Sequence, residues 1–316
     1  MQEASQRRRR EGISGPGGGA ALCGALLLYA AACSGSQVSP LLNAPTDSTH
    51  AVVEIAQFRD ARALAADPAG WLYVVDAAES TVSVLSATGE VIDTYGGPGT
   101  GEYSLLDPAD VDPTNGLDLF VADMGNGRIQ RFSRDGEFIE SVAVPVGDPG
   151  AALGRDVPEG RPLAVAVGPG GALYAAEGER GVVLRWESDR RLSRLLGLPE
   201  DGDGALIEPV DIAVSGEGTV FVADSRRNAV LVYDGLGTFR RAISGRASGG
   251  VRAVALAPSA EGERLLIVGP RAVAVHEASG GLVDVLRPAV SEDLVGAAVA
   301  GGELYVLTRT RLLRVE

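Results

Sequence analysis

A repeated strand pattern constrains this chain more than any other feature of its sequence. Four segments, WLYVVD, LFVADM, LYAAEG and VFVADS, align on an acidic residue, and these residues are Asp76, Asp123, Glu177 and Asp224. Each segment follows a short apolar run with a Gly-containing turn and precedes another run that alternates apolar and polar side chains. Alternation of this kind is typical of half-buried strands, and its recurrence every 47 to 54 residues predicts an array of small sheets.

The number of units predicts how the array closes. Two weaker copies begin at Val251 and Val295, which makes six units, and the last one ends a strand short. An unassigned strand, AVVEIAQF at residues 51–58, precedes the first unit. Four short strands per unit are typical of propeller blades, and a ring without an open edge resists association with other chains. We therefore predict an all-β, six-bladed β-propeller over residues 51–316, in which the N-terminal strand completes the last blade.

The first 33 residues differ from the rest of the chain. A basic run at residues 7–10 precedes an apolar run at residues 20–32, in the order of a secretory signal. About 13 apolar residues are too few to span a bilayer, which needs roughly 20. The ending AAACSG resembles a bacterial lipobox, although Ala30 stands where Leu is preferred, and this resemblance implies lipidation of Cys33. An ordinary secreted protein and a misplaced start are the alternatives, and residues 34–50 are predicted to form a flexible tether.

Composition narrows the possible partners and chemistry. The 28 basic residues are all Arg against 42 acidic ones, and the net charge of -14 argues against nucleic acid as a partner. A chain without lysine forms no Schiff base. Both cysteines, Cys23 and Cys33, precede the predicted propeller, which is therefore expected to contain neither a disulfide nor a reactive thiolate.

The second unit carries a family resemblance. ADMGNGRIQRF resembles the NHL repeat of six-bladed propellers closely, and ADSRRNAVLVY resembles it in part. The resemblance extends over residues 51–316 and implies the fold. It implies little about function, because such propellers include enzymes, binding modules and lipid-anchored proteins.

The turn after the second strand has two interpretations. The Asp123 carboxylate can accept hydrogen bonds from backbone N–H groups two or three residues on, and Gly125 and Gly127 permit unusual backbone angles. Asn126 tolerates a left-handed conformation, and Arg128 is expected near a carboxylate. The same turn recurs at Asp76, Glu177 and Asp224, which favours a structural role over ligand contact, because a ligand needs only one site.

Two connections are longer than a turn requires, at residues 144–162 and 196–209. Long loops on a rigid scaffold often carry binding residues. Such loops and the repeated turns predict a polar binding face at Asp76, Tyr103, Asp123, Asn126, Arg128, Arg155, Glu177, Asp224, Arg226 and Arg227. An ordinary solvated surface is the alternative interpretation.

A metal site is the other candidate. Asp110 and Asp211 occupy equivalent positions at the start of the predicted innermost strands, where the other units have Ala or Gly. Lactonase-type propellers resemble this class, and the resemblance implies a divalent cation such as calcium on oxygen ligands. Both residues alternatively cap the bend after Pro108 and Pro209. The isolated His50 and His276 do not form a multi-histidine zinc site.

These observations leave three functional hypotheses. The first is a non-catalytic binding or scaffold module, lipid-anchored in the bacterial cell envelope on the periplasmic or exterior side, for a protein, peptide or glycan partner. The second is a metal-dependent hydrolase or lactonase with the cation in the central mouth. The third is a purely structural ring in an envelope complex. No resident cofactor is expected apart from that possible divalent cation.

Overall fold

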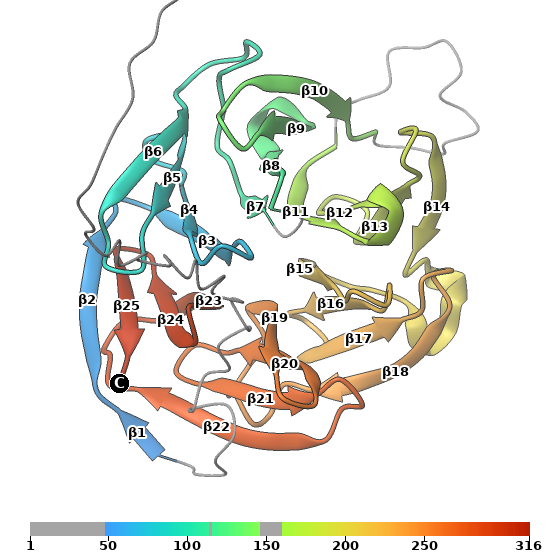
Figure 1. Cartoon of the computed structure of the whole chain (residues 1–316). Helices are drawn as coiled ribbons and strands as arrows, with labels where there is room; N and C mark the ends of the chain where they lie inside the picture. The colour runs from blue at the N-terminus through green and yellow to red at the C-terminus, as the bar shows by residue number, and fades with distance from the viewer. Residues whose placement is uncertain (1–47, 114–115, 146–159) are drawn as a thin grey trace, which may run out of the picture. The chain divides into compact units, whose positions relative to one another are not determined.

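Each unit of the repeat folds into a small antiparallel sheet, and six sheets are arranged around a centre (Figure 1). The computed structural model describes residues 48–113, 116–145 and 160–316. The predicted six-bladed β-propeller is confirmed. The predicted leader with Cys33, most of the predicted tether, and Arg155 lie outside the described residues.

The strands follow one order in the first four blades, from the innermost to the outermost. Blade 1 contains β3 (Ala61–Ala66), β4 (Leu72–Asp76), β5 (Thr81–Leu85) and β6 (Val91–Gly96). Blade 2 contains β7 (Asp110–Asp112), β8 (Asp118–Asp123), β9 (Arg128–Ser133) and β10 (Phe138–Ala143). Blade 3 contains β11 (Pro162–Val167), β12 (Leu173–Glu177), β13 (Val182–Trp186) and β14 (Leu192–Leu196). Blade 4 contains β15 (Pro209–Val214), β16 (Val220–Asp224), β17 (Ala229–Tyr233) and β18 (Phe239–Ser244).

The last two blades also receive strands from the N-terminal segment. Blade 5 contains β19 (Ala253–Ser259), β20 (Gly262–Val268), β21 (Val273–Glu277) and β22 (Leu282–Pro288), with β1 (Ser48–His50) beside β22. Blade 6 contains β23 (Leu294–Ala300), β24 (Glu303–Thr308) and β25 (Arg311–Val315), with β2 (Val52–Gln57) as its outer strand. Among the described residues, short 3-10 helices lie in three connections, at η2 (Met124–Asn126), η3 (Pro169–Gly171) and η4 (Pro199–Gly204).

The core lies between the blades rather than within one layer. Six apolar clusters each combine residues of two neighbouring blades, as where Tyr73 and Val75 of blade 1 pack with Leu119 and Val121 of blade 2. The second strands β4, β12 and β16 are buried along their whole length. Each sheet therefore has two apolar faces, and only a neighbour on both sides removes them from water.

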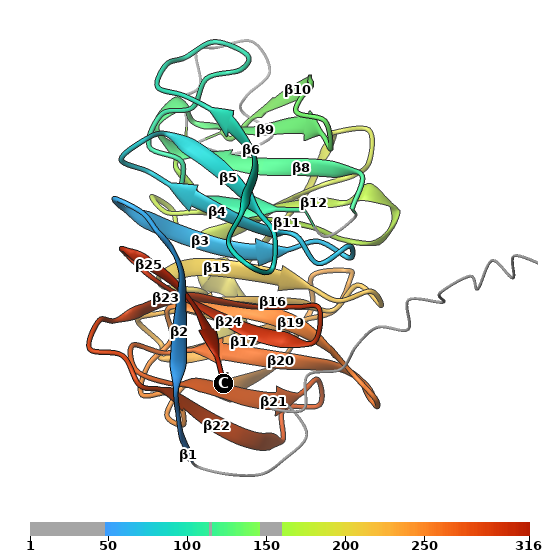
Figure 2. The same ribbon diagram turned by 60° about the vertical axis from the view of Figure 1, so that its left-hand side comes forward.

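The N-terminal strand closes the ring as predicted. β2 pairs antiparallel with β25, from Val52 opposite Val315 to Gln57 opposite Arg311. Figure 2 shows β2 running along β25 at the outside of blade 6. The pairing supplies the fourth strand of the last blade and covers the edge of the C-terminal strand.

One short strand departs from the sequence-based prediction. Ser48–His50, assigned above to the tether, form β1 and pair in parallel with β22, with Ser48 opposite Leu286. The backbone N–H of Ala289 donates to the carbonyl of His50 at 2.8 Å. The chain leading into β2 passes the outer edge of blade 5, and the unpaired backbone groups of that edge take up the extra strand.

Two long connections were predicted from the sequence. The first, at residues 144–162, includes residues 146–159, which lie outside the described residues. The connection at residues 197–208 contains η4 and packs on blade 4, where the Tyr233 hydroxyl donates to the carbonyl of Gly204 at 2.5 Å. Along the described residues, no helix has the length and apolar character needed to cross a membrane.

Closure by β2 leads to a testable prediction. A chain that starts at Phe58 loses β2, and we expect its melting temperature to fall by about 10 °C or more and the protein to associate as its concentration rises, because β25 becomes an open edge. A chain that starts at Ala51 loses β1 only and serves as the control. Differential scanning calorimetry and light scattering measure both effects, and equal melting of the two truncated chains would contradict the assignment.

Candidate functional site

The four repeated acidic residues are buried structural groups. Asp76 accepts hydrogen bonds from the backbone N–H of Arg59 at 2.8 Å and of Ala78 at 3.1 Å. The first donor lies in the loop that enters the blade and the second in the turn that follows. Glu177 accepts from Arg161 and Arg180 in the same way, and Asp224 accepts from Ile207 and Arg227. Each carboxylate thus ties the entering loop to the turn after the second strand.

Asp123 uses a different set of donors. One oxygen accepts from the backbone N–H of Leu106 at 2.7 Å, and the other accepts from the side chains of Asn126, Arg128 and Gln130 at 2.8, 2.7 and 3.1 Å. Its exposed fraction is 0%. The predicted bonds to the turn backbone are replaced by side-chain bonds, because the Asn and Arg of this turn reach the same oxygen. The loop donor lies 17 residues upstream, a distance at which local sequence gives no signal.

The remaining described residues of the predicted binding face belong to two regions, with Tyr103 against blade 2 and Arg226 and Arg227 after β16 of blade 4. The Tyr103 side chain lies against blade 2, where its hydroxyl donates to Glu137 at 3.2 Å and its ring lies 6.2 Å from that of Phe138. Arg226 is exposed, and Arg227 donates to the carbonyl of Asp203. None of the described residues of that set lines the hollow described next, and their role in binding stays a prediction.

A hollow of about 780 Å³ lies where the innermost strands of the six blades begin. In four blades the strand pairing shifts by one residue there, a β-bulge that inserts one extra residue into the inner strand. The extra residues are Arg62, Leu163, Val210 and Val295, and all four line the hollow. Bulges re-aim side chains, and these bulges bring one arginine and three apolar groups to a common space.

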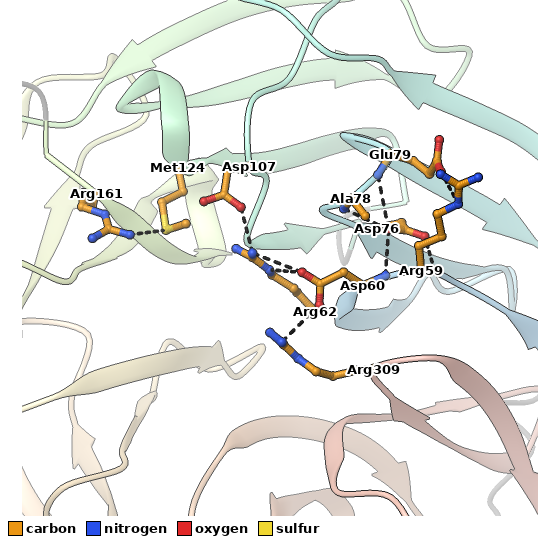
Figure 3. A network of polar contacts seen from close by, with 10 residues as sticks. All are labelled: Arg59, Asp60, Arg62, Asp76, Ala78, Glu79, Asp107, Met124, Arg161 and Arg309. Carbon is orange, nitrogen blue, oxygen red and sulfur yellow. Dashed lines mark hydrogen bonds and ion pairs between the residues drawn. The ribbon is translucent and has the colours of Figure 1, made fainter.

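Four arginines surround this hollow, which we call the mouth: Arg62, Arg161, Arg252 and Arg309. They come from blades 1, 3, 5 and 6. Figure 3 shows Asp60 between Arg62 and Arg309, with nitrogen–oxygen distances of 3.3 and 3.2 Å. The predicted binding face omitted all four. One sequence signal pointed to two of these arginines: Arg62 and Arg252 directly precede Ala63 and Ala253, the positions equivalent to Asp110 and Asp211.

The paired arginines are partly neutralised. Arg62 also approaches Asp107 at 2.8 Å, and Arg252 approaches Asp293 at 2.7 Å. Arg161 differs from these, because the contact found for its guanidinium is with the Met124 sulfur at 3.6 Å (Figure 3). The mouth therefore carries positive charge in a protein with a net charge of -14.

The two predicted metal ligands lie on the inner strands at the mouth end. Asp110 on β7 accepts from the backbone N–H of Val165 on β11 at 2.8 Å. Asp211 on β15 accepts from the N–H of Val254 on β19 at 2.8 Å and from its own neighbour Ile212. These bonds join neighbouring blades where no sheet pairing connects them, so both carboxylates have a structural role besides any predicted cation binding.

Burial and mutual repulsion perturb both carboxyl groups. Burial raises the pKa of Asp211 from its ordinary 3.8 to about 7, and the charge of Asp112 adds to the effect. Burial also raises the pKa of Asp110 well above its ordinary value, with a further contribution from the charge of Asp211. The carboxyl groups of blades 2 and 4 are thus close enough to influence each other, and acidification favours their neutral forms.

The residues present fit a metal ion poorly. Among the described residues, no group of three or more His, Cys, Asp or Glu side chains is arranged to hold one. Calcium takes six to eight oxygen ligands, whereas Asp110 and Asp211 provide two carboxylates already engaged with backbone N–H groups. His276 is buried in β21, the third strand of its blade, and its Nδ1 lies 3.2 Å from the carbonyl of Gly280.

Comparison with known proteins relates the chain to propellers of several kinds. No protein-family model matches it. It is similar to peptidyl-glycine alpha-amidating monooxygenase A of Xenopus laevis, with 30% identity over 185 residues, which cover 53% of this chain and 18% of that protein. Monooxygenase B of the same species is 33% identical over 122 residues, which cover 35% of this chain and 12% of that protein. The chain thus spans less than a fifth of the length of these relatives.

Solved structures share the fold at low identity. A protein assigned as a gluconolactonase superposes with a TM-score of 0.63 and 16% identity, covering 88% of this chain and 96% of the other. Streptogramin B lyase gives 0.60 and 11%, covering 84% and 97%, and luciferin-regenerating enzyme gives 0.59 and 14%, covering 84% and 94%. Identities this low establish the fold alone. The chain is a six-bladed β-propeller, and the finer NHL assignment stays a resemblance.

The perturbed carboxyl group gives a prediction about pH. The pKa of Asp211 is higher in the folded protein than in the unfolded chain, so the folded state is penalised as the pH rises from about 4 through about 7. Asp211→Asn keeps an acceptor for the Val254 N–H but does not ionise. We expect it to melt several degrees above the parent at about pH 8, with the difference shrinking towards about pH 5.

Calorimetric melting of both proteins across this range measures the effect. Glu217→Gln, which alters an exposed acid in the turn between β15 and β16, is the control and should follow the parent at every pH. A constant difference between Asp211→Asn and the parent would contradict the perturbed titration.

Proposed function

We propose that this protein is a binding propeller that receives part of a protein, peptide or glycan partner in its mouth. One observation carries the proposal: side chains from all six blades meet around a single hollow of about 780 Å³. This volume lies within the range of ligand pockets, and such pockets combine apolar walls with a few placed polar groups. The mouth has that composition, with Leu163, Val210 and Val295 among arginines.

The scaffold suits recognition because it is rigid. Buried carboxylates such as Asp76 and Glu177 fix the loops that enter the blades, so the mouth is held in shape before a partner arrives. Preorganisation reduces the ordering cost of binding. We further propose that the chain is attached to the bacterial envelope through a lipid on Cys33, as its lipobox-like sequence indicates.

A hydrolase or lactonase is the second candidate. Propellers of similar fold include streptogramin B lyase and a protein assigned as a gluconolactonase, so this fold is compatible with catalysis. The specific observation in its favour is the repulsion between Asp110 and Asp211, which a cation between them would relieve. Their engagement with backbone N–H groups weighs against a full ligand set.

Blocking the mouth tests the binding proposal. Ser225 lies in the turn after β16 and lines the mouth, so Ser225→Trp places a large side chain there. Glu217→Trp puts the same side chain in an exposed turn at the opposite end of β16 and is the matched control. The parent protein is used to capture ligands from an envelope extract. Mass spectrometry identifies the captured ligands, and isothermal calorimetry then measures their affinity for each variant.

We expect Ser225→Trp to weaken binding of the captured ligand at least about tenfold, because the indole occupies the space that the ligand needs. Glu217→Trp should bind like the parent. Unchanged affinity in Ser225→Trp would show that the partner binds elsewhere. Turnover of lactones by the parent that requires a divalent cation and disappears in Asp110→Asn and Asp211→Asn would instead favour the enzyme.

The lipid anchor has a separate test. Mass spectrometry of the protein produced in a bacterial host should find the N-terminal cysteine of the processed chain at Cys33 with added acyl mass, and membrane fractions should contain the protein. Cys33→Ala removes the sulfur that carries the lipid, so the protein should shift to the soluble fraction. An unmodified parent would contradict the anchor without affecting the propeller.

A further inference from the structure

The arginines of the mouth differ in what already neutralises them. Arg62 approaches both Asp60 and Asp107, and Arg309 approaches Asp60. Arg252 shares Asp293 with Arg271, at nitrogen–oxygen distances of 2.7 and 3.4 Å. An anion that binds any of these three mouth arginines competes with a carboxylate that is already in place.

Arg161 has no such competitor among the described residues. Its side chain is exposed, and its Nη2 atom contacts the Met124 sulfur at 3.6 Å. A thioether is a weak acceptor and leaves most of the guanidinium donors available. Figure 3 shows the Arg161 side chain beside Met124 and away from the cluster around Asp60.

Hydrogen bonds hold the backbone of Arg161, whereas its guanidinium contacts only the Met124 sulfur among the described residues. Its N–H donates to Glu177 at 3.1 Å, and its carbonyl accepts from the N–H of Gly178 at 3.0 Å. The preceding residue, Gly160, donates to the carbonyl of Val144 at 2.7 Å. The charged group is therefore presented from a fixed point, which reduces the ordering cost of ligand binding.

Apolar side chains line the mouth together with Arg161. Leu163 follows two residues later at the bulge of the same strand, and the equivalent bulge residues of blades 4 and 6 are Val210 and Val295. All three line the mouth together with Met124. A ligand that reaches Arg161 thus covers apolar surface as well.

We propose that the mouth binds an organic monocarboxylate with an apolar body, whose acid group pairs with Arg161 and whose body packs on Leu163, Val210 and Val295. This inference rests on the proposed binding function of the mouth. A planar guanidinium matches a carboxylate through two parallel hydrogen bonds. Among the described residues, Arg161 is the mouth arginine without a carboxylate partner, which favours a ligand with one negative charge over a dianion. The overall charge of -14 opposes an anion only at long range, because salt screens it beyond about 8–10 Å.

Two sources share this chemistry, a free aliphatic acid and the C-terminus of a peptide. The experiment therefore uses two probe pairs on the full chain: decanoate with decanamide, and the peptide N-acetyl-Ala-Ala-Leu as the free acid with its C-terminal amide. Isothermal calorimetry measures each with the parent, Arg161→Ala, Arg161→Lys and Arg194→Ala. The last variant removes an exposed arginine on β14, the outermost strand of blade 3, and is the matched control away from the mouth.

For the parent we expect at least one acid to bind about tenfold or more tightly than its amide, since the amide lacks the charge. Arg161→Ala should weaken that acid roughly 10- to 100-fold and remove the preference over the amide. Arg161→Lys should restore part of the preference, and Arg194→Ala should change affinity by less than about threefold, because solvent and salt screen a charge on the outer strand. The probe pair that shows the preference identifies the source.

Equal binding of acid and amide, or an acid affinity that Arg161→Ala does not change, would overturn the inference. Absence of binding by either acid at millimolar concentration would overturn it as well. These outcomes differ from failure of the proposed function. If acid and amide bind equally and Ser225→Trp abolishes both, the mouth still binds ligands but does not select an anion through Arg161.

Discussion

Each blade of this protein has two apolar faces, and this constraint explains the rest of the architecture. A four-stranded sheet of short strands cannot shield both of its faces, so every blade depends on the neighbour at either side. The six inter-blade clusters satisfy this requirement only when the ring is complete. The pairing of β2 with β25 completes it with strands from opposite ends of the propeller. The stability of every blade is therefore coupled to the pairing of β2 with β25.

The repeated acidic residues and the residues of the proposed binding site are different. The most regular polar feature, the acidic residue at the end of the second strand, is buried and accepts a hydrogen bond from the entering loop in four blades. In contrast, equivalent positions of different blades carry different residue types where they line the mouth. The mouth therefore has chemically different sides, as a specific ligand site needs. The bulge residue is Arg62 in blade 1 but Leu163, Val210 and Val295 in blades 3, 4 and 6. One structural device thus presents a charge at one side of the hollow and apolar surface at the others.

The inner strands β7 and β15 also carry the carboxyl groups of Asp110 and Asp211 next to the arginine-lined mouth. Asp110 and Asp211 each accept a backbone N–H from the next blade, which compensates for the lack of sheet pairing between inner strands. Burial of these carboxyl groups raises the pKa of each, and they affect each other through their charges. The same two residues therefore stabilise the blade junctions and make that stability sensitive to pH. Their equivalent positions in the repeat, where other units have Ala or Gly, are what suggested a metal site from the sequence.

The sequence by itself determined the repeat, the number of blades and the completion of the last blade by the segment at residues 51–58, because strand alternation and turn residues are local signals. It also indicated that Asp76, Glu177 and Asp224 serve their own turns. Tertiary structure decided the second partner of each carboxylate, the pairing of β1 with β22, and the meeting of Arg62, Arg161, Arg252 and Arg309. These contacts join residues of different blades or distant loops. Their geometry depends on how the ring closes and on the positions of the β-bulges. Neither feature produces a repeating pattern in the local sequence.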